Sequence, residues 1–152
     1  TIGSEYLSQC VNSVDKQTYS DLTHYIFMDG KEHWEKINDT ISGATKVKTI
    51  ALEENVGKGW YGHRVYSACS FLVNADVICY LDEDNWIEPN HVESLVNIIE
   101  QGNDWAFSLR KIYDKEGMVI RTSFWSAEKR VDSYALAEKT KTGDVFELNT
   151  DF

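Results

Sequence analysis

The feature that most constrains the fold is an apolar run that ends in three adjacent acidic residues. The run Val77–Leu81 reads Val-Ile-Cys-Tyr-Leu and leads directly into Asp82, Glu83 and Asp84. A run of this kind predicts a strand buried on both faces, as in a parallel sheet with helices on either side. Such sheets bind ligands beyond the carboxyl ends of their strands, which is where the three carboxylates would lie.

The three adjacent carboxylates predict a cation site. Neighbouring negative charges repel one another unless water or a cation relieves them. In an extended segment residues i and i+2 point the same way, so Asp82 and Asp84 can converge while Glu83 turns aside. We expect Mn²⁺ or Mg²⁺ here, because these ions accept one or two carboxylates together with phosphate oxygens. The alternative is a solvated acidic loop, since an isolated Asp-x-Asp occurs by chance in many proteins.

Length and charge narrow the class of protein. A chain of 152 residues fits one domain with a proper core. Its 25 acidic and 15 basic residues give a net charge of −10, which disfavours nucleic acid as a partner. We find no signal-peptide pattern and no apolar run of the roughly 18 to 20 residues that span a membrane. We therefore expect a cytoplasmic protein whose Cys10, Cys69 and Cys79 are reduced core thiols.

Apolar periodicity predicts that helices and strands alternate along the chain. Helices are expected over residues 4–16, 31–39, about 60–73 and 90–99, the last capped by Asn90 with Glu93. Strands are expected over residues 22–28, 46–52, 77–81 and 104–109. A hairpin around residues 115–117 precedes a helix over 133–140 and a short strand over 144–148. Alternation of this kind predicts an α/β sandwich with a mainly parallel sheet flanked by helices.

Two other segments could border a ligand. Asp29 ends a predicted strand ahead of Gly30, so its carboxylate could accept hydrogen bonds from a ribose or base, or simply form a turn. In the loop of residues 55–59, Asn-Val-Gly-Lys-Gly, the glycines let backbone approach a ligand. Lys58 or Arg64 could then offset phosphate charge. The glycine spacing is not that of a phosphate-binding P-loop, and an ordinary surface loop remains the alternative.

Taken in order, these pieces resemble the family 2 glycosyltransferases with the GT-A fold, a Rossmann-like sandwich. The resemblance covers about the first two thirds of the chain, and residues 55–89 look most like bacterial members. It rests on Tyr6-Leu7, Ser13-Val14, Gln17-Thr18-Tyr19, Asp29-Gly30, Asn55-Val56-Gly57, Gly62-His63-Arg64, and Leu81-Asp82-Glu83-Asp84-Asn85 with Pro89. It implies metal-dependent, inverting transfer of a sugar from a UDP- or GDP-linked donor to an acceptor hydroxyl.

The resemblance also implies roles for single residues. Asp29 matches a strand-end Asp that contacts the nucleoside. Asp82 and Asp84 match the family's Asp-x-Asp, in which the first residue supports the donor and the second binds the metal. Asn55, Gly57 and Arg64 fall where the family's Asn-x-Gly segment and following helix border the nucleotide, so we expect all three near the donor.

Two departures from the family pattern concern the ends of the chain, both of which look cut. The family's first strand survives only as Thr1-Ile2. The catalytic base has no clear match, and Glu128, Asp132 and Asp151 remain candidates. We expect one GT-A-like domain, with a donor-binding part over about 1–110 and an acceptor-side part over about 111–152.

Two other readings stay open. The chain could be a non-catalytic GT-A scaffold that binds a partner or saccharide, as the missing strand and base would allow. A nucleotidyltransferase shares the architecture, but it would carry a basic, glycine-rich loop near its N-terminus, and residues 1–5 contain no Lys or Arg. A cut sheet edge would leave unpaired backbone, which could favour a homo-oligomer.

Overall fold

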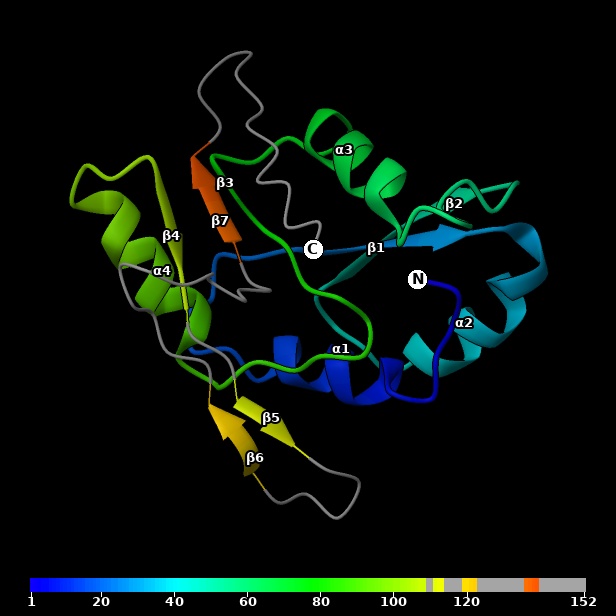
Figure 1. The fold of residues 1–152 in the computed structure, drawn as a ribbon, viewed down its shortest axis with the longest axis horizontal. Coiled ribbons are helices and arrows are strands. Elements are labelled where there is room, and N and C mark those ends of the chain that lie inside the picture. The colour runs from blue at the N-terminus through cyan, green and yellow to red at the C-terminus, as the bar shows by residue number, and fades with distance from the viewer. Residues whose placement is uncertain (109–110, 114–118, 123–135, 140–152) are drawn as a thin grey trace.

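The computed structural model describes residues 1–108, 111–113, 119–122 and 136–139, in which helices and strands alternate (Figure 1). The elements are α1 (Leu7–Asp15), β1 (His24–Asp29), the 3₁₀ turn η1 (Lys31–His33), α2 (Trp34–Ile41), β2 (Val47–Leu52), α3 (His63–Leu72), β3 (Val77–Cys79), α4 (His91–Glu100), β4 (Trp105–Phe107), β5 (Lys111–Tyr113), β6 (Val119–Thr122) and β7 (Leu136–Lys139). The predicted α/β class is confirmed. Within these residues, no helix is long and apolar enough to cross a bilayer.

The first sheet is the parallel pair that the alternation predicts. β1 and β2 pair in parallel from His24 opposite Val47 to Asp29 opposite Leu52. The crossover between them contains η1 and α2. A parallel pair needs such a crossover, because a tight turn can join only antiparallel neighbours.

The second sheet differs from the prediction in two places. Its strand order is β3-β7-β4, and β7 is antiparallel to both neighbours. β7 lies within residues 133–140, which were predicted to be helical, and β3 ends at Cys79 rather than Leu81. Ladder hydrogen bonds from two strands outweigh the weak local preference of residues 136–139. The hairpin of β5 and β6 is confirmed, whereas the strand predicted over 144–148 lies outside the described residues.

Helices cover β1 and β2 on two sides. Figure 1 shows α1 and α2 on one side of these strands and α3 on the other. The main core lies on the α1 and α2 side and contains Leu7, Val11, Ile26, Met28, Ile37 and Ile41. A smaller cluster joins α4 to β4 through Leu95, Ile99 and Ala106, with Val77 and Cys79 of β3 packed against it. The three cysteines are free thiols, as predicted, but only Cys10 is buried, whereas Cys69 and Cys79 are half-buried.

A hydrogen-bonded clamp joins the end of α1 to the start of α4. The buried Gln17 side chain donates to the Glu88 carbonyl at 2.7 Å and accepts the Val92 N–H at 2.9 Å. The predicted pairing of Asn90 with Glu93 is wrong, since the Asn90 side chain makes no capping bond and Glu93 accepts the Thr18 hydroxyl instead. The clamp fixes the segment that follows the acidic residues 82–84.

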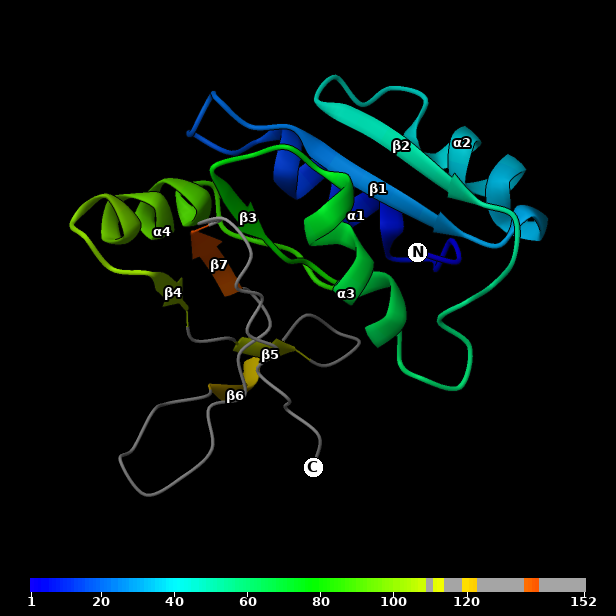
Figure 2. The same cartoon turned by 90° about the horizontal axis from the view of Figure 1, so that it is seen from above.

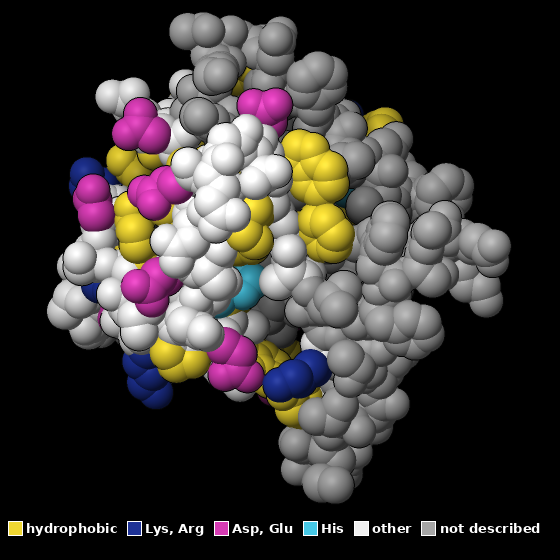
Figure 3. All heavy atoms as spheres, turned by 90° about the vertical axis from the view of Figure 1, so that its left-hand side faces the viewer, with side chains coloured by type: hydrophobic (Ala, Val, Ile, Leu, Met, Phe, Trp, Pro, Cys, Tyr) yellow, Lys and Arg dark blue, Asp and Glu magenta, His cyan; other side chains and the backbone are white. Residues whose placement is uncertain are grey.

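The surface is acidic, as the net charge of −10 requires. Figure 3 shows acidic side chains spread over the face that carries α4 and β4, with hydrophobic side chains between them. Ile98 and Trp105 are 39% and 53% exposed. Such a surface repels the phosphate backbone of nucleic acids.

Candidate functional site

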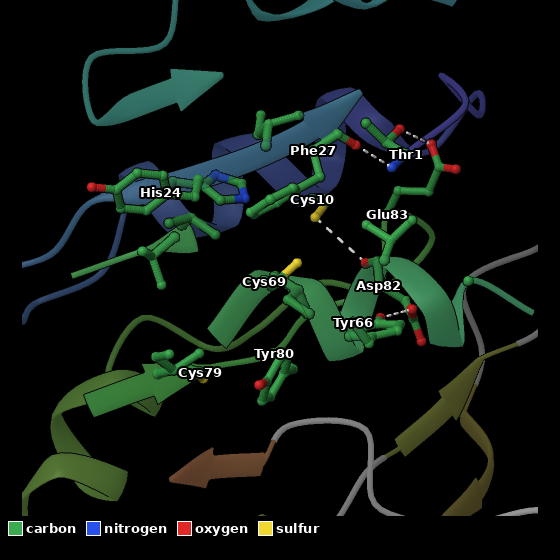
Figure 4. Close-up of a pocket in the computed structure, with 18 of the residues that line it drawn as sticks. Thr1, Cys10, His24, Phe27, Tyr66, Cys69, Cys79, Tyr80, Asp82 and Glu83 are labelled. Atoms are coloured by element: carbon green, nitrogen blue, oxygen red, sulfur yellow. Dashed lines mark hydrogen bonds between the residues drawn. The ribbon is translucent and has the colours of Figure 1, made fainter. Parts of the chain in front are cut away.

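Polar side chains from separate strand ends line one large cavity. Asp29 lies at the carboxyl end of β1, and Asp82 lies three residues beyond β3. Both line a cavity of about 1470 Å³, together with Asn55 and Gly57 of the loop after β2. The structure therefore brings together four of the predicted donor-site residues, although they are far apart in the sequence. Figure 4 shows Asp82 among the residues that line this cavity.

The acidic residues form a tight turn rather than an extended segment. The Asn85 N–H donates to the Asp82 carbonyl at 3.1 Å, so residues 82–85 reverse direction. We call them the acidic turn. The predicted convergence of Asp82 and Asp84 assumed extended backbone, and that geometry does not hold across the turn. Asp84 is exposed, and its Oδ1 accepts the Asn85 side-chain amide at 3.0 Å.

Tyr66 of α3 holds the side chain of Asp82. Its hydroxyl donates to Asp82 Oδ1, and its ring packs edge-on against Tyr80 with centroids 5.5 Å apart (Figure 4). Burial raises the pKa of Asp82; the Tyr66 hydrogen bond opposes the rise, while the charges of Asp84 and Glu83 add to it. No motif singles out this tyrosine, and sequence reasoning missed it. Its only signal is its place on the helix that follows the 55–59 loop.

Glu83 points away from its acidic neighbours and binds the N-terminal segment. Its carboxylate accepts the Thr1 hydroxyl, the Ile2 N–H at 3.1 Å and the Ser4 N–H at 2.7 Å. Burial opposes ionisation of Glu83, but these hydrogen bonds outweigh it and hold its pKa below the ordinary value. Glu83 thus fastens the acidic turn to residues 1–4.

Asp29 organises the loop of residues 55–59. Its side chain is 5% exposed, with Oδ1 accepting the Val56 N–H at 2.8 Å and Oδ2 accepting the Gly57 N–H at 3.0 Å. A Cβ at Gly57 would lie 2.7 Å from Asp29 Oδ2, so this close approach requires glycine. In this structure the Asp29 carboxylate holds the 55–59 loop at the wall of the cavity. Contact between Asp29 and a nucleoside stays a prediction.

The other predicted residues differ in where they lie. The walls of the cavity, as far as the described residues form them, include Lys58 but neither Arg64 nor Asp84. The Arg64 guanidinium lies over the Trp60 ring, 4.6 Å from its centroid. The candidate bases Glu128, Asp132 and Asp151 lie outside the described residues.

The acidic turn offers two carboxylates, Asp82 and Asp84, as possible ligands of a metal ion, and the metal stays a prediction. Among the described residues, no group of three or more His, Cys, Asp or Glu is arranged to hold a metal. Tyr66 uses one oxygen of Asp82 and Asn85 uses one of Asp84, which leaves a second oxygen on each carboxylate. Two carboxylates suit Mg²⁺ or Mn²⁺, which keep waters and take ligand phosphates for the rest of their shell.

Fold and site together define an α/β protein with a large cavity at the carboxyl ends of its strands, which is where proteins of this class bind ligands. Residues 3–146 match the sequence profile described as Glycosyl transferase family 2, and the chain belongs to this family. The fold is accordingly the GT-A-like, Rossmann-like α/β fold that the sequence predicts.

A curated relative is also a glycosyltransferase. The chain is 32% identical over 101 residues to a glucosyl-dolichyl phosphate glucuronosyltransferase from Haloferax volcanii. The alignment covers 66% of this chain but only 31% of that relative. The chain therefore matches less than a third of the relative's length. The predicted resemblance to bacterial members of the family stays a prediction.

Proposed function

We propose that the chain binds a UDP- or GDP-linked sugar and contributes to transfer of the sugar to an acceptor hydroxyl. Membership of family 2 supports sugar transfer in general. The observation that carries the proposal is the convergence of the Asp29-held loop and the Tyr66-held Asp82 on one cavity. In this arrangement backbone of the 55–59 loop faces the nucleotide, and Asp82 faces the diphosphate and sugar.

Mn²⁺ or Mg²⁺ bound by Asp84 and Asp82 forms part of the proposal. The ion would neutralise charge on the leaving diphosphate. A protein with net charge −10 needs such neutralisation to bind a diphosphate beside its own carboxylates. Asp82, already oriented by Tyr66, would keep one oxygen turned to the ligand, while Lys58 lines the same cavity and supplies positive charge.

Inverting transfer also needs a base that deprotonates the acceptor. Within the proposal this base comes from the acceptor-side part over about 111–152, where Glu128, Asp132 and Asp151 are the candidates. Sugar transfer or donor hydrolysis above background would separate an enzyme from a non-catalytic GT-A scaffold.

Thermal unfolding with nucleotides tests donor binding. At about 100 times its dissociation constant a ligand adds about 2.7 kcal/mol, or roughly 5 to 10 °C for a chain of this size. We expect UDP or GDP to raise the melting temperature only with Mn²⁺ or Mg²⁺ present, and Asp84→Ala to abolish the rise.

The matched control is Asp39→Ala, which removes an exposed carboxylate on α2, away from the cavity. Asp39→Ala should keep the full shift. No shift with any nucleoside diphosphate, or an equal shift in Asp84→Ala, would contradict the proposal.

A further inference from the structure

An exposed tyrosine with a strained backbone stands at the mouth of the cavity. Tyr61 lies in the segment that loops outward from the carboxyl end of β2 and turns back into α3 (Figure 2). It is 91% exposed, yet it forms part of the cavity wall. Its φ of 50° is the only positive value at a non-glycine position among the described residues. A bulky residue rarely adopts this conformation, and such strain gathers at ligand sites.

Hydrogen bonds on both sides of Tyr61 hold its backbone in this conformation. The Gly57 carbonyl accepts the Trp60 N–H at 3.0 Å and the Gly62 N–H at 3.4 Å, and these bonds enclose the tyrosine. Gly57 is itself fastened to the Asp29 carboxylate through its N–H. The backbone of Tyr61 is therefore fixed before any ligand arrives. A side chain presented in this way loses little freedom when it binds a ligand.

The neighbouring side chains on this side of the cavity are already engaged. Asp29 is buried and uses both carboxylate oxygens to hold the loop. One face of the Trp60 ring is covered by the Arg64 guanidinium, and Trp60 is not part of the wall that the described residues form. The Tyr61 ring meets the His63 ring edge-on, with centroids 6.5 Å apart, and its high exposure leaves a ring face free for a ligand.

The contacts of Gly62 show which part of the cavity Tyr61 borders. The Gly62 Cα lies 3.1 Å from the place of a Cβ at Gly57, and a Cβ at Gly62 would lie 3.8 Å from the Tyr66 ring. Tyr61 therefore lies between the 55–59 loop and the tyrosine that holds the acidic turn. Its ring offers a flat, apolar face there, and the part of a nucleotide with a matching flat face is the base.

We propose that Tyr61 binds the base of the donor nucleotide by stacking its ring on the base. The inference rests on the proposed function and adds to it a residue that determines affinity for the nucleoside. Every base has a π-face, so Tyr61 favours a nucleoside diphosphate over pyrophosphate without selecting one base. Stacking also removes an exposed aromatic ring from water, which adds to the affinity.

Titration calorimetry in the presence of Mn²⁺ tests the stacking. In Tyr61→Ala we expect UDP and GDP to bind about tenfold to a hundredfold more weakly, the range that loss of one base–aromatic stack costs. Tyr61→Phe keeps the ring and should bind both nucleotides as the parent chain does. Inorganic pyrophosphate has no base, so it should bind equally to the parent and to Tyr61→Ala.

Two further variants separate stacking from support of the fold. Tyr61→Gly removes both the ring and the strain, and it should melt no lower than the parent because glycine adopts a φ of 50° without steric cost. Phe71→Ala is the matched control, since it removes a 74% exposed ring of α3 outside the described wall of the cavity. Its affinity for UDP should equal that of the parent.

The outcomes distinguish this inference from the proposed function. Equal UDP affinity in Tyr61→Ala and the parent would overturn the stacking and leave donor binding intact. Weaker binding in Tyr61→Phe, an equal loss for pyrophosphate, or a lower melting temperature for Tyr61→Gly would also overturn it, because each result assigns the tyrosine another role. Failure of the parent to bind either UDP or GDP would contradict the proposed function itself, and the stacking with it.

Discussion

At the scale of single residues, Tyr66 fixes the orientation of the Asp82 side chain. The hydroxyl bonds one carboxylate oxygen while the ring packs on Tyr80, so the side chain cannot turn freely. This bond joins α3 to the acidic turn across 16 residues of sequence. Within the proposed function Tyr66 is a positioning residue, because it would act on the donor through Asp82.

Tyr66→Phe keeps the ring contact and removes the hydroxyl. We expect titration calorimetry of UDP with Mn²⁺ to show binding about tenfold weaker, the order that a lost hydrogen bond to a charged group costs. The melting temperature without ligand should change much less than the affinity. Tyr6→Phe, at an exposed position outside the cavity wall, is the control and should bind as the parent does. Equal affinity in Tyr66→Phe would contradict a positioning role.

His24 makes stability depend on pH. Burial lowers its pKa to about 4, with the charge of Asp15 opposing the shift. Because the unfolded chain takes up this proton near pH 6.5 and the folded chain does not, the contribution is complete above pH 6.5 and is lost toward pH 4. Between pH 7 and pH 5 this single group should cost about 2 kcal/mol of unfolding free energy.

Urea unfolding at the two pH values tests this expectation. His24→Gln should lose less stability on acidification than the parent chain. His33→Gln, which changes a histidine 3.6 Å from the Glu32 carboxylate, is the comparison and should keep the parent's loss. Equal losses in the parent and His24→Gln would show that the buried imidazole is not the source.

At the scale of elements, the 55–59 loop depends on glycine at one position. A Cβ at Gly57 would lie 2.7 Å from Asp29 Oδ2 and 3.1 Å from the Gly62 Cα. Gly57→Ala must therefore move the loop or break the Asp29 hydrogen bonds, and we expect a loss of about 1 to 3 kcal/mol in urea unfolding. Gly43→Ala meets no atom within 4 Å and should cost far less. Similar costs at both positions would refute this role for Gly57.

Local pattern predicted the early elements well. Apolar residues at helical spacing placed α1, and β-branched and aromatic residues placed β1 and β2, because each element buries one face locally. The same reasoning failed at β7, where two partner strands far away in sequence supply the ladder. It also failed at Asn90 and Glu93, because Gln17 and Thr18 reach the start of α4 from another part of the chain.

At the scale of the whole molecule, the site depends on long-range contacts. The acidic turn is joined to residues 1–4 through Glu83, to α3 through Tyr66, and to α1 through the Cys10 thiol, which lies 3.5 Å from the Asp82 carbonyl. The Asp29 N–H of β1 donates to the Thr1 carbonyl at 2.9 Å, so a change that releases residues 1–4 from β1 would also loosen the acidic turn.

The sequence alone determined the α/β class, the family resemblance and the gathering of Asp29, Asn55, Gly57 and Asp82 at strand ends. Periodicity and strand-end acids are local properties, so they can be read without coordinates. Only the tertiary structure decided that Tyr66 holds Asp82, that Glu83 binds the N-terminal segment and that Asp29 accepts the backbone N–H groups of Val56 and Gly57. These features are contacts between backbone and side-chain groups that lie 16 or more residues apart in the sequence. A local sequence pattern cannot predict such contacts.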